Sequence, residues 1–262
     1  MRLRELLRFS WRTSAFVVCT VGCWCCFELE HLLRGKSKRL LVVNRWVPCW
    51  ANLSLRLYGV QVELHGDFVD SGKLYPSRAE NGVGRIFVAN HCSGMDIPIL
   101  FTAVEAHVIS RHDLASWPLI GRSARRIGTL FVDRQSRRSG ASVLKAVDRT
   151  LELGEGVAMF PEGTAHVGDE VHEFRTGAFN AARRAGAEII PIGLAYGDEA
   201  AYYRKEPFMT HIKRVAGIRR FRVAVEIGTP LTLEKHSAVE VKDLAHASVQ
   251  KLVDRGRKRL EE

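Results

Sequence analysis

Short runs rich in β-branched residues alternate with helically spaced apolar residues from about residue 60 onward. The runs predict strands over Val60–Leu64, Arg85–Ala89, His107–Ser110, Thr129–Val132, Val157–Phe160, Ile189–Ala195 and Phe221–Ile227. The helical spacing predicts helices over Ile97–Val104, Ser142–Leu153 and Gly177–Ala185, and a packing helix across Val241–Val253. Strands that alternate with helices favour one α/β domain over residues 61–262, with a largely parallel mixed sheet flanked by helices.

The first 60 residues have a different pattern, in which two apolar-rich stretches lie between basic residues. Ala15–Phe27 contains no charge, and as a helix it would span about 20 Å against the ~30 Å hydrocarbon core of a bilayer. Leu40–Val60 carries Trp46 and Trp50 among arginines, a mixture typical of the headgroup level of a membrane. We interpret residues 1–60 as a two-helix membrane-docking module. A tilted span, a re-entrant helix, an interfacial helix and a hairpin packed on the domain all fit the pattern.

The charge distribution favours a membrane surface as the anionic partner. Lys and Arg number 39 against 29 Asp and Glu, which gives a net charge of +10. Two basic blocks, within residues 1–12 and 34–45, flank the most apolar stretch. We therefore expect an anionic membrane surface rather than nucleic acid, at the cytoplasmic face of the cell membrane. Four of the six cysteines fall within residues 19–26 among apolar neighbours, without a second pair at zinc-like spacing, so we expect no metal.

A histidine and an aspartate follow the strand expected at Arg85–Ala89. His91 and Asp96 are five positions apart, so on one regular helix their side chains would point in different directions. They meet only if the chain turns between them, and we expect Gly94 to supply that turn with a positive φ angle. Asp96 would then open the next helix, accept a hydrogen bond from His91 Nδ1 and raise the basicity of Nε2. The pair predicts a general base that activates a substrate hydroxyl.

Three further strand ends carry polar or Gly/Pro residues. Asp133-Arg134 and Pro161-Glu162-Gly163-Thr164 each follow a predicted strand, and Pro191-Ile192-Gly193 follows Glu188-Ile189-Ile190. In open α/β sheets, ligands bind at the carboxyl ends of the strands, so these segments are expected at one site. There is no G-x-S-x-G nucleophile elbow, although Cys92 and Ser93 stand beside the histidine and leave a lipid hydrolase as an alternative.

This ordered set of four blocks resembles the PlsC-type glycerolipid acyltransferases, the 1-acylglycerol-3-phosphate (lysophosphatidate) acyltransferases. The resemblance implies that His91, oriented by Asp96, deprotonates the free sn-2 hydroxyl of 1-acylglycerol-3-phosphate, which attacks a thioester to make phosphatidate. The donor would be acyl-CoA or an acyl-carrier protein, with no other cofactor. Arg134 would hold the phosphate or another anionic headgroup. Glu162 would fix its loop or bind acceptor hydroxyls, and Gly163 and Thr164 would line that loop.

One block departs from the family pattern. Such enzymes usually continue the E-G-T block with an arginine, whereas Ala165 and His166 follow here. Arg175 is a candidate replacement for the missing phosphate contact. The departure leaves room for another acceptor, such as a lyso-ornithine lipid. A non-catalytic protein that binds anionic lipid is a further alternative.

Overall fold

The computed structural model describes residues 3–66, 68–69, 72–133, 136–231 and 236–262. Its centre is one seven-stranded sheet in the order β1-β7-β6-β2-β5-β3-β4. All neighbouring strands run parallel except β6 and β7, which confirms the largely parallel mixed sheet predicted from the sequence. The strands are β1 (Val60–His65), β2 (Ile86–Ala89), β3 (His107–Arg111), β4 (Leu130–Val132), β5 (Val157–Met159), β6 (Ile189–Tyr196) and β7 (Phe221–Ile227).

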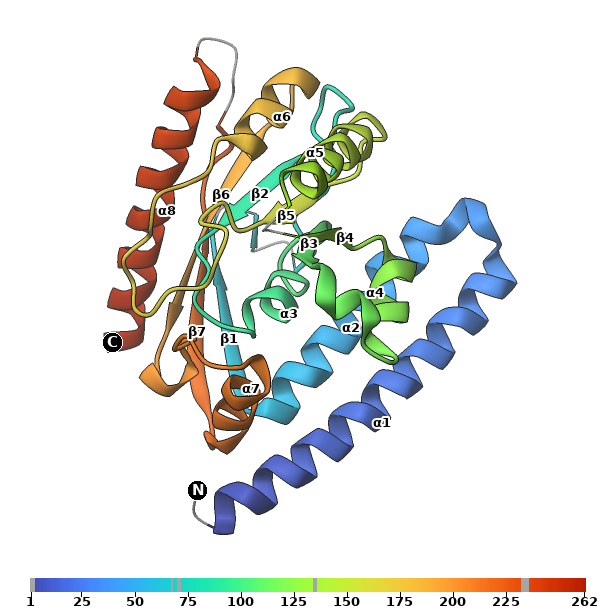
Figure 1. The fold of residues 1–262 in the computed structure, drawn as a ribbon, viewed down its shortest axis with the longest axis vertical. Coiled ribbons are helices and arrows are strands. Elements are labelled where there is room, and N and C mark those ends of the chain that lie inside the picture. Colours follow the sequence, from blue (N-terminus) through green and yellow to red (C-terminus); the bar gives the residue numbers. More distant parts are fainter. Residues whose placement is uncertain (1–2, 67, 70–71, 134–135, 232–235) are drawn as a thin grey trace.

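Helices cover both faces of the sheet, so the core has two halves (Figure 1). One face packs against α5 (Arg137–Glu152), α6 (Gly177–Ala185) and α8 (Ala238–Glu261). The other packs against α2 (Arg39–Tyr58) and α3 (Asp96–Leu100), with α4 (Ile120–Ile127) and α7 (Phe208–Gly217) beside them. Central strands are buried on both sides because alternate side chains enter the two halves of the core.

The N-terminal segment is a hairpin of two long helices. α1 (Leu3–Arg34) turns through a short 3₁₀ helix at Lys36–Lys38 into α2, which ends one residue before Gly59 and strand β1. α2 lies between α1 and the sheet, and its buried side chains recur every three to four residues. α1 is long and apolar enough to cross a membrane, and only 17% of its most apolar window is buried. The docking role of residues 1–60 stays a prediction.

Several predicted helix bounds were wrong. The helix expected over Ile97–Val104 stops at Leu100, where Thr102 bonds back to the Ile99 carbonyl and closes a turn. The helix expected from Ser142 starts at Arg137, because the Ser136 hydroxyl caps it by accepting from the Ser139 amide. α4 and α7 were not predicted.

Candidate active site

The predicted histidine–aspartate pair comes together at the carboxyl end of β2. His91 Nδ1 lies 2.7 Å from Asp96 Oδ2, and the Asp96 side chain is fully buried. Asp96 begins α3, as the sequence predicts. The His91 ring stacks on Phe160, with 4.2 Å between ring centroids and 14° between planes. This contact fixes the plane of the imidazole, and the bond to Asp96 leaves His91 Nε2 as the nitrogen that can act on a ligand.

The turn between His91 and Asp96 forms differently from the prediction. Gly94 does not have a positive φ angle; instead the backbone wraps around the Asp96 carboxylate. Asp96 Oδ2 accepts from the amides of Cys92 at 2.8 Å and Ser93 at 2.9 Å. Gly94 is needed for space, because a Cβ there would lie 2.9 Å from Phe208 Cε2.

His211 of α7 holds the same loop from the opposite side. The Gly94 amide donates to His211 Nε2 at 2.9 Å, and the His211 side chain has no exposed surface. Burial lowers the pKa of His211 to about 4, so the ring is neutral and Nε2 can accept. Sequence analysis missed this residue because a single histidine in an unrecognised helix carries no local signal.

Two further side chains anchor the site to β6. The Asn90 side chain accepts from the Leu194 amide at 2.8 Å and donates to the Leu194 carbonyl at 2.9 Å. The Tyr196 hydroxyl donates to Asp96 Oδ1 at 2.5 Å. Neither role was predicted, although Asn90 directly precedes His91 and Tyr196 ends strand β6.

The loop after β5 supports the backbone of His91. Glu162 accepts from the amide of His91 at 2.6 Å and from that of His172 at 3.1 Å. Both carboxylate oxygens of Glu162 therefore accept hydrogen bonds from backbone amides. This favours the alternative in which Glu162 fixes its loop over the one in which it binds acceptor hydroxyls. Burial raises the pKa of Glu162 to about 7 despite these two donors. Gly163 has φ 79° and lies under the Arg175 guanidinium, where a Cβ would come within 2.7 Å of Arg175 Cζ.

Of the two arginines that the sequence suggested as phosphate ligands, the structure describes only Arg175. Arg134 lies outside the described residues. Arg175 is exposed and, among the described residues, its guanidinium has no acidic partner. Two other arginines near the site are already paired: Arg111 with Asp113 at 2.7 Å, and Arg126 with Glu28 at 2.9 Å.

The adjacent nucleophiles are not arranged for covalent catalysis. Cys92 is 2% exposed, and burial raises the pKa of its thiol well above the usual value. The Ser93 hydroxyl lies 3.3 Å from His211 Nε2 and is 1% exposed. The geometry therefore does not favour the hydrolase alternative. Among the described residues, no group of three His, Cys, Asp or Glu side chains could hold a metal ion.

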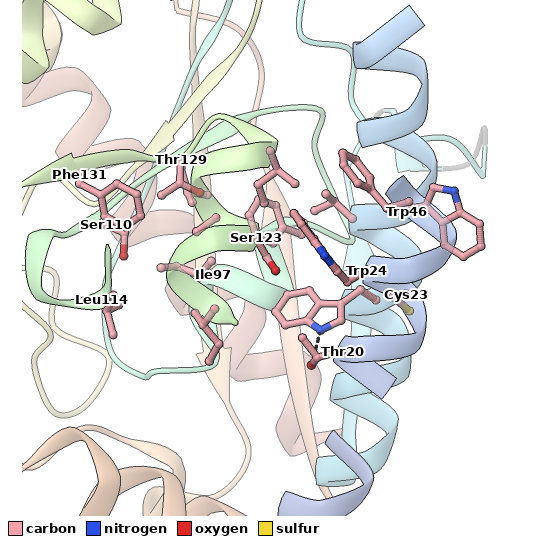
Figure 2. Close-up of a pocket in the computed structure, with 18 residues that line it drawn as sticks. Thr20, Cys23, Trp24, Trp46, Ile97, Ser110, Leu114, Ser123, Thr129 and Phe131 are labelled. Atoms are coloured by element: carbon pink, nitrogen blue, oxygen red, sulfur yellow. Dashed lines mark hydrogen bonds between the residues drawn. The ribbon is translucent and has the colours of Figure 1, made fainter. Parts of the chain in front are cut away.

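Two adjoining cavities lie near the site, and His91 lines one of them. One of about 160 Å³ is lined by His91, Thr164 and Ala165, and it contains Arg111 and Trp117 at its rim. The other, of about 170 Å³, is almost wholly apolar and lies between the helical hairpin and the domain. Figure 2 shows Thr20 and Trp24 of α1 lining this second cavity, whose far wall includes Phe131. Both cavities are lined by Ile97, Ser110 and Leu114, so they adjoin.

Comparisons with known proteins agree on one class. The family model described as Acyltransferase matches residues 72–195. The chain is 27% identical over 181 residues to a 1-acyl-sn-glycerol-3-phosphate acyltransferase of Neisseria gonorrhoeae, covering 66% of this chain and 71% of that protein. It is also 27% identical over 240 residues to a lyso-ornithine lipid O-acyltransferase of Rhizobium meliloti, covering 82% and 78%. The crystal structure of the 1-acyl-sn-glycerophosphate acyltransferase PlsC from Thermotoga maritima superposes with a TM-score of 0.74 at 20% identity, over 97% of this chain and 96% of that one.

The protein is therefore an acyltransferase rather than a lipid-binding protein without catalysis. Its fold, the His91–Asp96 block and these relatives agree with the resemblance that the sequence suggested. Residues 72–195 match the Acyltransferase family model, and the chain is similar to PlsC-type glycerolipid acyltransferases in sequence and in fold.

Proposed function

We propose that the protein transfers a fatty acyl group from a thioester donor to the sn-2 hydroxyl of 1-acylglycerol-3-phosphate, making phosphatidate. The observation that carries the proposal is the His91–Asp96 pair, whose histidine lines a small cavity with some polar lining, next to an almost wholly apolar one. A hydroxyl to be activated and an acyl chain to be sequestered need such neighbouring environments.

The reaction follows from the protonation pattern of the pair. His91 Nδ1–H donates to Asp96, so the Nε2 lone pair is free to take the proton of the acceptor hydroxyl. As that proton moves, the hydroxyl oxygen attacks the thioester carbonyl and a new ester C–O bond forms. The C–S bond then breaks, and the proton on Nε2 passes to the leaving thiolate, which departs as free thiol. Asp96 stabilises the imidazolium that exists between the two transfers.

The donor in this proposal is acyl-CoA or an acyl-carrier protein, and its acyl chain occupies the apolar cavity. α1 forms one wall of that cavity and also presents exposed apolar side chains, including Leu7, Val18 and Leu32. A helix that does both supports a location of the cavity beside the membrane from which the lysolipid comes. We propose that this surface is the anionic cytoplasmic face of the cell membrane, because basic blocks flank the apolar stretch.

The phosphate of the acceptor is assigned to Arg134 and Arg175, with Gly163 and Thr164 lining the loop. Arg175 supports this assignment because its guanidinium lies over Gly163 and has no acidic partner in the part of the chain that the structure describes. A lyso-ornithine lipid is the second candidate acceptor. Ala165 favours it, because no cation stands where similar enzymes usually have an arginine, and the Rhizobium meliloti relative matches over 240 residues.

An acceptor panel tests both candidates. Purified protein is mixed with labelled acyl-CoA and either lysophosphatidate or lyso-ornithine lipid in vesicles, and release of free thiol is followed. We expect the higher rate with lysophosphatidate; a preference for lyso-ornithine lipid would establish the second candidate instead.

The His91→Ala variant tests the general base. Its activity should fall by about 10²- to 10⁴-fold, whereas His236→Ala, at an exposed position before α8, should retain full activity. Full activity in the His91→Ala protein would refute the mechanism.

A further inference from the structure

The Asp96 carboxylate has two oxygens, and only one of them serves the bond to His91. Oδ2 accepts from His91 and from the Cys92 and Ser93 amides. Oδ1 accepts from the Tyr196 hydroxyl at 2.5 Å, and the other donor near it is the weak Cys92 thiol at 3.9 Å. Because Asp96 has no exposed surface, water cannot replace a lost donor at Oδ1.

Tyr196 is held in the core so that its hydroxyl proton points to Asp96, while Ser93 also interacts with the hydroxyl. Tyr196 is the last residue of β6 and is 1% exposed. Its backbone carbonyl accepts from Arg257 at 2.8 Å, and its ring packs against Tyr202 and Phe221. Burial and the nearby Asp96 carboxylate raise the pKa of Tyr196 well above the usual value, so the phenol keeps its proton.

We infer that Tyr196 is a positioning residue for the transferase reaction: its hydroxyl orients the Asp96 carboxylate and shares its negative charge, and so sets the basicity of His91. This inference rests on the proposed role of His91. A carboxylate that shares its charge with a strong donor attracts the imidazolium proton less than one that does not. Loss of the hydroxyl should therefore strengthen the attraction between Asp96 and the imidazolium, and the acid limb of the pH–activity profile should move to higher pH.

Other titratable groups face this pair and must stay unchanged in the comparison. They come from the β5 loop, from the segment before α6, from α7 and from α8: Glu162, His166, Asp169, His172, His211 and Arg257, together with Cys92 and Tyr202. Tyr202 offers a matched control. Its ring lies 5.9 Å from that of Tyr196, and its hydroxyl donates to a different carboxylate, that of Asp169, at 2.6 Å.

The experiment compares Tyr196→Phe with Tyr202→Phe in the full-length protein, using kcat/KM across pH. For Tyr196→Phe we expect the acid limb to move up by about one pH unit and kcat to fall about tenfold, with KM within about twofold. Imidazole NMR, with the His91 signal assigned from His91→Ala, should show the signal of the protonated ring persisting to higher pH in Tyr196→Phe. Tyr202→Phe should show neither change.

The inference is overturned if Tyr196→Phe keeps the parent pH profile, or if Tyr202→Phe shifts it equally, which would indicate packing alone. Should Tyr196→Phe fail to fold, 3-fluorotyrosine in the Tyr202→Phe protein provides a stronger donor at position 196, and the acid limb must then move to lower pH. Failure of the proposed function gives a separate result, because His91→Ala would then remain active whatever Tyr196 does.

Discussion

Arg12 of the apolar helix α1 is a buried cation whose removal should destabilise the whole protein. The side chain is 7% exposed, and it donates to the carbonyls of Ala216 at 3.0 Å, Ile218 at 2.5 Å and Arg219 at 2.8 Å. These carbonyls lie at and just beyond the C-terminal end of α7, where backbone acceptors have no partner within the helix. A guanidinium is also favoured there by the helix dipole.

The perturbation is Arg12→Met, which keeps the apolar stem and removes the three donors. A hydrogen bond from a charged donor contributes about 1.5–3 kcal/mol, and the three share one guanidinium and are not additive. We therefore expect the free energy of unfolding to fall by about 3 kcal/mol. For a chain of this size, that loss corresponds to a decrease in Tm of about 6–12 °C.

The assay is thermal unfolding followed by circular dichroism in one detergent at one pH. Arg34→Met is the control, because Arg34 lies on the same helix in an exposed pair with Glu30, and exposed ion pairs contribute little to stability. A Tm for Arg12→Met equal to that of the parent protein would refute the reasoning, since the buried carbonyl contacts would then contribute nothing. A matching loss in both would place the effect in α1 itself.

Two further predictions concern the loop after β5 and the apolar cavity. Burial raises the pKa of Glu162 from 4.5 to about 7, so the folded state holds a proton that the unfolded state has released, and stability should fall as pH rises through that window. In Glu162→Gln, urea unfolding at pH 5, 6, 7 and 8 should lack this contribution to the decrease in the free energy of unfolding with pH. The same pH dependence in the variant and the parent would contradict the prediction. Ala124→Phe fills the apolar cavity and should lower kcat/KM for long-chain relative to short-chain acyl-CoA about tenfold, whereas an equal loss for both would exclude the cavity as the acyl site.

The sheet could be predicted well from sequence because its strands are short, β-branched and separated by clear helical segments. All seven predicted strands exist, within one or two residues of the expected bounds. Their order could not be predicted. β7 enters between β1 and β6 and runs antiparallel to β6, a pairing between distant segments that no local pattern records. α4 was missed for a local reason, since three arginines in eight residues hide its few apolar positions.

In the candidate site, too, residues with a local chemical signal were predicted, whereas constraints from distant contacts were not. His91, Asp96 and Glu162 were predicted because their residue types and strand-end positions carry a chemical signal. The role of Gly94 was predicted wrongly, since its constraint comes from Phe208 and His211, more than one hundred residues away. Steric limits of this kind depend on packing between helices and loops, and a turn residue in the sequence does not reveal them.

The residues that hold the reacting pair come from segments that do not themselves face the substrate. Tyr196 reaches Asp96 from inside the sheet, and His211 reaches the Gly94 amide from α7. The far end of α7 is capped by Arg12 of α1, so one continuous set of contacts joins the apolar helix to the loop that carries His91. Displacement of α1 would first remove the donors from the carbonyls at the end of α7. It would then weaken the hydrogen bond from the Gly94 amide to His211 Nε2. The geometry of the general base therefore depends on the packing of α1, and Arg12→Met should lower kcat more than Arg34→Met at temperatures where both variants are folded.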